Sequence, residues 1–124
     1  MKRISIALLF MAGCSIMPPP PTVTTATPTP FAYPGIFTGA VTNGTLTYRI
    51  GADGRGLSCF RNLLTGRMSF GDVKYDGARL HTEDGTFEVD GVSPEELRLH
   101  VLWLNAVLRK VDGPPTVCKE FFKN

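Results

Sequence analysis

Six Asn-Gly and Asp-Gly dipeptides divide the chain after residue 40 into short segments, and this spacing constrains the fold more than any other feature. They lie at residues 43–44, 53–54, 76–77, 84–85, 90–91 and 112–113. Asparagine and aspartate tolerate a left-handed backbone and glycine adopts it freely, so these pairs are typical of the tight turns that join antiparallel strands. We therefore expect many short strands connected in sequence order.

The residues between these turns alternate between apolar and polar side chains. Leu46, Tyr48 and Ile50, for example, are separated by polar neighbours. A period of two is typical of a strand with one face in a core. The pattern predicts a mainly β domain, an antiparallel meander curled into a small barrel or half-barrel with at most one short helix.

Residues 93–111 fit two structures. Their first four residues, Ser-Pro-Glu-Glu, have the cap, the proline and the glutamate of a helix start. The apolar residues that follow, however, would spread around the whole circumference of a helix. As strands, alternate residues from Leu97 to Trp103 share one face, and a turn near Asn105 lets the chain return. We favour the hairpin.

The first fourteen residues have the order of an export signal. Lys2 and Arg3 form a basic start, residues 4–10 form an apolar run, and Met-Ala-Gly-Cys follows at residues 11–14. The apolar run is shorter than the roughly 20 residues that a helix needs to cross a bilayer. An ordinary cleaved signal and a buried N-terminal segment are two interpretations of this order.

This segment resembles the signal of bacterial prolipoproteins, and its last four residues resemble a lipobox in which Met11 stands where leucine is usual. The resemblance implies that diacylglycerol is joined to the thiol of Cys14 and that residues 1–13 are removed. Because Ser15 follows the cysteine instead of aspartate, it also implies sorting to the outer membrane of a Gram-negative cell. Cys14 would then hold the protein to that membrane.

Residues 14–32 are interpreted as the lipidated cysteine and a tether. Residues 15–30 contain six prolines and no charged residue, and such a chain favours an extended conformation of about 3.1 Å per residue. We expect a spacer that holds the folded domain, residues 33–124, away from the membrane. Binding of this segment to peptidoglycan or to a proline-recognising partner is the alternative.

The three cysteines have separate roles if Cys14 is lipidated. Cys59 and Cys118 then remain, and the oxidising periplasm favours a disulfide between them. Such a bond would stabilise a domain of this size by about 4 kcal/mol on the chain-entropy model. The alternatives are two free buried thiols, or metal ligation together with His81 and His100, for which the usual zinc-site spacings are absent.

Candidate catalytic groups are few. An acid–base site would have to use His81, Glu83 and Asp84, but alternation places His81 and Glu83 on the solvated face of a strand end. The glycine-rich residues 51–56 lack the order of a phosphate-binding loop, and Ser69 is one residue out of the nucleophile-elbow pattern. We predict no catalytic residue, no metal site and no cofactor.

Charge excludes one class of partner, and four large side chains suggest another. Removing Lys2 and Arg3 from the 13 basic residues balances the 11 acidic ones, so nucleic-acid binding is not expected. The candidate partner-binding residues lie at the junction of tether and domain, or on strand faces that alternation exposes. They would form a binding site if they gather into one patch, whereas a barrel with covered faces would bury them. They are Phe31, Tyr33, Phe60 and Leu102.

A small lipid-anchored β domain without a catalytic site is, by analogy, a binding protein. We expect a non-catalytic binding or assembly module of the cell envelope, held in the outer membrane and associated with an envelope protein. Two other functions stay open. One is inhibition of a lysozyme-like or other secreted enzyme through residues 53–56 or 84–85, and the other is transport of a small apolar ligand inside the barrel.

Overall fold

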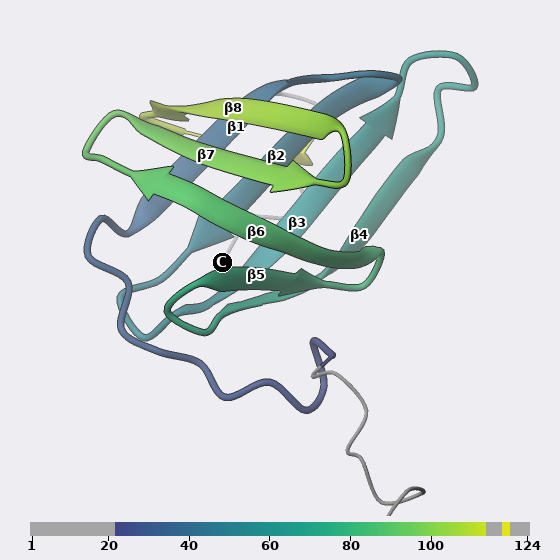
Figure 1. Ribbon diagram of the computed structural model, residues 1–124. Helices are drawn as coiled ribbons and strands as arrows, with labels where there is room; N and C mark the ends of the chain where they lie inside the picture. The colour runs from purple at the N-terminus through teal and green to yellow at the C-terminus, as the bar shows by residue number, and fades with distance from the viewer. Residues whose placement is uncertain (1–21, 114–117, 120–124) are drawn as a thin grey trace, which may run out of the picture.

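The computed structural model describes residues 22–113, 118 and 119, and its eight strands form one closed antiparallel barrel (Figure 1). Each strand pairs with the next along the chain, and β1 closes the barrel against β8. The predicted mainly β fold is thereby confirmed. The strands are β1 Gly35–Val41, β2 Gly44–Ile50, β3 Arg55–Asn62, β4 Met68–Tyr75, β5 Arg79–Thr82, β6 Gly85–Val92, β7 Glu96–Val101 and β8 Leu104–Val111.

Four of the six Asn-Gly and Asp-Gly dipeptides lie where the chain reverses between strands, at residues 43–44, 53–54, 76–77 and 84–85. Asp90-Gly91 does not. It lies within β6, whose register with β7 shifts between Val89 and Gly91. One extra residue there bulges the strand without ending it.

Within the described residues, no helix has the length and apolarity needed to cross a membrane.

Residues 93–111 form the expected hairpin of β7 and β8. The residues that resemble a helix start form the β6–β7 turn instead. There the Ser93 hydroxyl accepts a hydrogen bond from the backbone N–H of Glu96 at 3.1 Å. A serine that caps a helix can equally close a turn. The β7–β8 turn lies at Leu102 and Trp103, earlier than the position predicted near Asn105.

This earlier turn changes the surroundings of Trp103. Alternation was expected to place it on the face shared with Leu97 and Leu99, which are both buried. Trp103 lies instead in the turn, and 87% of it is exposed. The prediction for Trp103 was wrong because its position depends on where the hairpin reverses.

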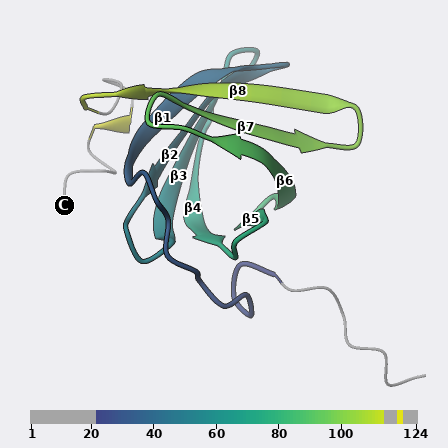
Figure 2. The same ribbon diagram turned by 60° about the vertical axis from the view of Figure 1, so that its left-hand side comes forward.

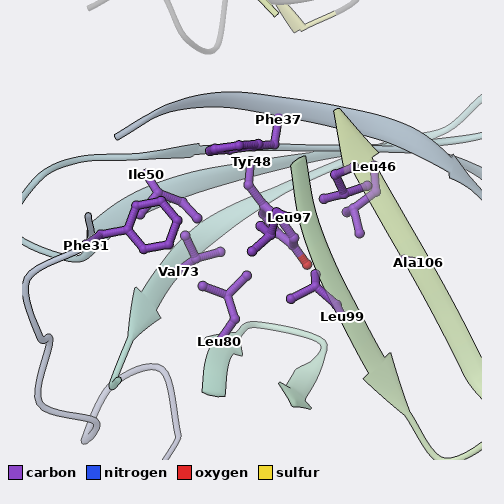
Figure 3. Close-up of a cluster of buried hydrophobic side chains, with 11 residues drawn as sticks. Phe31, Phe37, Leu46, Tyr48, Ile50, Val73, Leu80, Leu97, Leu99 and Ala106 are labelled. Carbon is purple, nitrogen blue, oxygen red and sulfur yellow. The ribbon is translucent and has the colours of Figure 1, made fainter. Parts of the chain in front are cut away.

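The interior of the barrel is filled by alternate residues of the strands (Figure 3). Aromatic and branched aliphatic side chains from opposite walls meet there and exclude water, which is the main favourable contribution to folding. The buried members of this core are Phe31, Phe37, Leu46, Tyr48, Ile50, Val73, Leu80, Leu97, Leu99, Ala106 and Leu108.

Phe31 closes one end of the barrel. It precedes β1, yet it is only 3% exposed, and its ring packs edge-on against Phe37 and Tyr75 with centroid distances of 6.1 and 5.1 Å. The backbone N–H of Phe31 donates to the carbonyl of Ala52, and that of Thr29 donates to the carbonyl of Tyr75. These bonds hold the N-terminal segment across the end that carries the β2–β3 and β4–β5 turns.

The packed domain therefore begins earlier than residue 33, where the sequence analysis placed the boundary. Within the supposed tether, Val23 and Ala26 are also buried, and the Lys74 ammonium donates to the carbonyl of Thr24 at 3.2 Å. Apolar residues between the prolines pack against the barrel. Of the expected spacer, residues 22–32 belong to the folded part.

A disulfide joins Cys59 to Cys118, as predicted. Cys59 lies on the outer face of β3, opposite the inward side chain of Phe60, and both sulfurs are buried with Leu57 and Met68 packed against them. Cys118 thus covers part of the outer wall at β3. The disulfide links it to a strand in the middle of the barrel.

Candidate functional site

The end of the barrel opposite Phe31 contains a cavity of about 230 Å³. This open end carries the β1–β2, β3–β4, β5–β6 and β7–β8 turns, and the N-terminal segment crosses the other end (Figure 2). Most of the cavity surface is apolar. Its apolar lining residues are Val41, Leu46, Phe60, Phe87, Leu104 and Ala106, and its polar ones are Thr42, Asn43, Tyr48, Ser58, Thr82 and Asp84.

Small inward-facing residues keep this cavity open. Ser58 faces Tyr48 across the β2–β3 ladder, and Ala106 faces Leu99 across the β7–β8 ladder. The closed half of the barrel has larger residues at its inward positions, such as Phe37 and Leu97. An eight-stranded barrel is just wide enough either to be filled by side chains or to hold one small ligand. This barrel is filled in one half and hollow in the other.

Tyr48 provides a polar group inside the cavity. It is 1% exposed, and its hydroxyl points into the barrel interior near Leu99 (Figure 3). Tyr48 is one of the residues that line the cavity. Burial, with a smaller contribution from the negative charge of Asp84, raises the pKa of Tyr48 far above its ordinary value. The hydroxyl therefore stays neutral and can donate a hydrogen bond to a bound molecule.

The charged residue at the mouth of the cavity is acidic. Asp84 lies in the β5–β6 turn, where its backbone N–H donates to the Thr82 hydroxyl, and that hydroxyl donates to the carbonyl of Gly85. None of the described lining residues is lysine, arginine or histidine. The site therefore disfavours a carboxylate or phosphate within the cavity and accepts a neutral or cationic molecule.

His81 is buried, contrary to the expectation that it lies on a solvated face. It is 1% exposed; its Nε2 donates to Asp76 Oδ2 at 2.7 Å, and its Nδ1 lies 3.2 Å from the Thr86 hydroxyl. Because both ring nitrogens have partners, the imidazole can leave water. Alternation alone does not predict such partners.

The candidate acid–base and metal ligands do not form one site. Glu83 lies against Gly71, on which a Cβ would come within 2.3 Å of the Glu83 Cγ. His100 pairs with Asp90 at 2.7 Å, so each histidine has a carboxylate of its own. In the part of the chain that the structure describes, no three histidine, cysteine, aspartate or glutamate side chains come together as metal ligands.

The His81–Asp76 pair makes stability depend on pH. Partial burial raises the pKa of Asp76, but hydrogen bonds from His81 and from the backbone N–H groups of Ala78 and Arg79 outweigh it, so this pKa lies below its ordinary value of 3.8. A carboxyl whose pKa is lowered by folding stabilises the native state above its unfolded pKa. That contribution is lost as the pH falls through the folded pKa.

We expect Asp76→Asn to lower the free energy of unfolding by about 1.5 kcal/mol at pH 7, because a hydrogen bond to a charged group is replaced by one to a neutral amide. The difference from the parent chain should shrink below about pH 4. Urea denaturation from pH 7 to pH 2.5 measures both effects. Asp112→Asn, at an exposed position after β8, is the matched control, and an equal response of the two variants would contradict the prediction.

The four candidate partner-binding residues do not gather into one patch. Phe31 is in the core and Phe60 lines the cavity, whereas Tyr33 and Leu102 are exposed. A different exposed set is found at the open end. It comprises Leu63 and Leu64 in the β3–β4 turn and Leu102 and Trp103 in the β7–β8 turn.

No protein-family model, curated protein or solved structure matches this chain. The function is therefore argued from the site itself. Cys14, on which the predicted lipidation depends, lies outside the described residues.

The sequence kept a carrier of a small apolar ligand as an alternative and placed Leu46, Tyr48 and Phe87 on the apolar faces of their strands, but it did not locate the cavity. The available signal was the presence of small residues such as Ser58 and Ala106 at inward positions of their strands. Whether small residues of different strands lie at the same level along the barrel axis depends on the register of all eight strands. Alternation within one strand does not contain that information.

Proposed function

We propose that this protein is a lipid-anchored outer-membrane protein whose barrel binds a small, mainly apolar molecule at its open end. The observation that carries the proposal is the apolar cavity lined by Tyr48, whose hydroxyl points into the barrel interior. Concave apolar sites with a few convergent polar groups are the usual form of small-molecule binding sites. The lipobox-like residues 11–14 support the anchor.

The lining predicts the chemistry of the ligand. A protein cavity of about 150 Å³ accepts benzene, so the cavity of about 230 Å³ found here has room for a substituted ring or a short alkyl chain. Tyr48 would donate to an acceptor such as an ether, carbonyl or amine. Asp84 at the mouth favours a neutral or cationic molecule over a carboxylate.

Filling the cavity should abolish this binding. We expect Ala106→Leu to weaken binding of the small neutral fluorescent probe 1-naphthylamine by at least about tenfold, because the added carbons occupy the ligand's space. Val107→Leu is the matched control, since Val107 is the next residue of β8 and is exposed on the outer wall. Fluorescence titration of the purified full chain measures both affinities.

A second variant separates the hydrogen bond from the cavity volume. Tyr48→Phe removes only the hydroxyl, so it should leave binding of an alkane such as octane unchanged and weaken binding of the related alcohol several-fold. Displacement of the probe measures these affinities. Unchanged probe affinity in Ala106→Leu, with an unchanged melting temperature, would contradict the proposed ligand site.

The broader expectation, a binding module of the cell envelope, also has support from one observation. The exposed leucines and the tryptophan lie in two turns of the open end, which also contains the cavity. Exposed apolar residues that cluster on a soluble domain mark interaction sites. Docking of this end on an envelope component is therefore compatible with ligand binding in the cavity.

Enzyme inhibition has less support. Of the two candidate loops, residues 53–56 lie at the closed end, where a Cβ on Gly54 would meet the Thr29 carbonyl oxygen at 2.1 Å. That loop is part of the packed end and does not project. Residues 84–85 lie at the open end, and they remain the loop that an inhibitor would use.

A further inference from the structure

Two hairpin tips at the open end project large apolar side chains into solvent. Leu64 is 80% exposed in the β3–β4 turn and Trp103 is 87% exposed in the β7–β8 turn, and each has a leucine beside it. Figure 1 shows both turns at the same end of the barrel. A leucine or tryptophan in such a position contributes nothing to the core. Its apolar surface can be buried only against another molecule that the tip contacts.

A side chain holds the β3–β4 tip, and a residue with a left-handed backbone forms the β7–β8 tip. In the β3–β4 turn, the Asn62 side-chain oxygen accepts from the N–H groups of Leu64 and Thr65 at 2.9 and 3.2 Å. In the other turn, Leu102 has a φ of 52°. Glycine would adopt that angle without strain, and yet a leucine with an exposed side chain stands there.

The charges beside the β3–β4 tip are positive. Its sequence from residue 61 is Arg-Asn-Leu-Leu-Thr-Gly-Arg, and both Arg61 and Arg67 are exposed. In the described part of the chain no ion pair involves either arginine. Leucines projecting between two arginines match a bilayer interface, where hydrocarbon lies beneath anionic headgroups.

The length of the tether keeps the barrel close to the membrane. Because Val23 already packs on the barrel, only residues 15–21 separate Cys14 from the described chain, and the span from Cys14 to Thr22 is at most about 28 Å when fully extended. An eight-residue strand such as β3 is itself about 26 Å long. The barrel therefore stays within about one barrel length of the bilayer.

The tether meets the barrel at its side wall. Val23 and Thr24 line a hollow on the barrel wall with residues 55–56 of β3 and 72–74 of β4, and Glu83 of the β5–β6 turn also lines it. The described chain thus begins beside the barrel wall, and not beyond the closed end (Figure 1). A short tether attached there allows the open end to face the membrane.

From these observations we infer that the open end docks on the lipid bilayer, with the tips at Leu63-Leu64 and Leu102-Trp103 inserted in the interface and with Arg61 and Arg67 beside the headgroup phosphates. The inference rests on the lipid anchor of the proposed function. It adds a membrane-facing orientation, in which the cavity mouth opens toward the bilayer and an apolar ligand can enter without crossing water.

Trp103 is the only tryptophan of the chain, so its fluorescence reports on one tip alone. The experiment uses the full chain with Cys14→Ser, which prevents acylation, and vesicles of phosphatidylcholine with or without phosphatidylglycerol. We expect the emission to shift to shorter wavelength on adding vesicles and to be quenched by lipids brominated near the headgroup. Phosphatidylglycerol should strengthen the response roughly fivefold for each arginine at the surface.

Residues 1–13 remain in this chain and can attach it to vesicles by themselves. The readout is therefore the emission of Trp103, which reports its surroundings, and not attachment. The double variant Leu63→Asp, Leu64→Asp changes two exposed turn positions. It should raise the lipid concentration that gives half of the Trp103 emission shift by at least about tenfold. Val107→Asp, an exposed apolar position on the barrel wall, is the matched control and should leave the shift unchanged.

Unchanged Trp103 emission at saturating lipid would overturn the inference. So would emission that responds to an extract of envelope proteins and not to vesicles, since the tips would then bind a protein. The cavity is tested separately, because the Leu63 and Leu64 variant should keep its probe affinity and Ala106→Leu should keep the vesicle response. Failure of membrane docking and failure of ligand binding are thereby distinguishable.

Discussion

Replacing Cys59 and Cys118 together by alanine is expected to lower the free energy of unfolding by about 4 kcal/mol. The two cysteines are 59 residues apart, so their bond removes many conformations from the unfolded chain. It also fixes Cys118 against Leu57 and Met68 on the outer wall. For a small domain this is a large share of a total stability of about 5–15 kcal/mol.

Urea denaturation of the full chain, with Cys14→Ser in both the parent and the variant, measures this loss. Reduction of the parent chain by dithiothreitol is the control, because it breaks the same bond without changing a side chain. The two losses should agree to within about 1 kcal/mol. A double variant as stable as its oxidised parent would show that the barrel does not depend on the disulfide.

Phe31→Ala is expected to lower the free energy of unfolding by about 3–5 kcal/mol, because truncating a buried aromatic residue removes its transfer free energy and leaves a cavity. Phe31 contacts Phe37 and Tyr75 at the closed end. Tyr33→Ala is the matched control two residues away, where 36% of the side chain is exposed, and its expected cost is below about 1 kcal/mol.

Thermal and urea denaturation of both variants provide the comparison. The difference between them tests whether residues before β1 belong to the folded domain, as the structure shows, or to a spacer, as composition suggests. Equal stabilities of the two variants would mean that the N-terminal segment does not close the barrel in solution.

The two ends of the barrel have different roles in this account. The closed end contains Phe31, the covered β2–β3 turn and the large residues of the core, all of which contribute to stability. The open end contains the cavity and the exposed tips, which contribute little to the core. Function is proposed for the end where apolar side chains line a cavity or project into solvent.

Local patterns in the sequence determined the elements of this protein. Tight-turn dipeptides and strand alternation depend on the φ preferences of adjacent residues and on the two-residue period of a strand, so both could be read without knowing the fold. They predicted the hairpins, the inward faces of Leu46 and Tyr48 and the β structure of residues 93–111. Cysteine counting predicted the Cys59–Cys118 bond, which the structure contains.

Other features depend on contacts between distant residues, and only the tertiary structure decided them. His81 is buried because Asp76 and Thr86 satisfy its nitrogens, and Phe31 is buried because barrel closure creates an end for it to fill. Ser58 and Ala106, from strands that are not neighbours, both line the cavity, and the register of the whole barrel brings them to it. A sequence pattern predicts which way a side chain points within its strand, but the space it meets depends on every other strand.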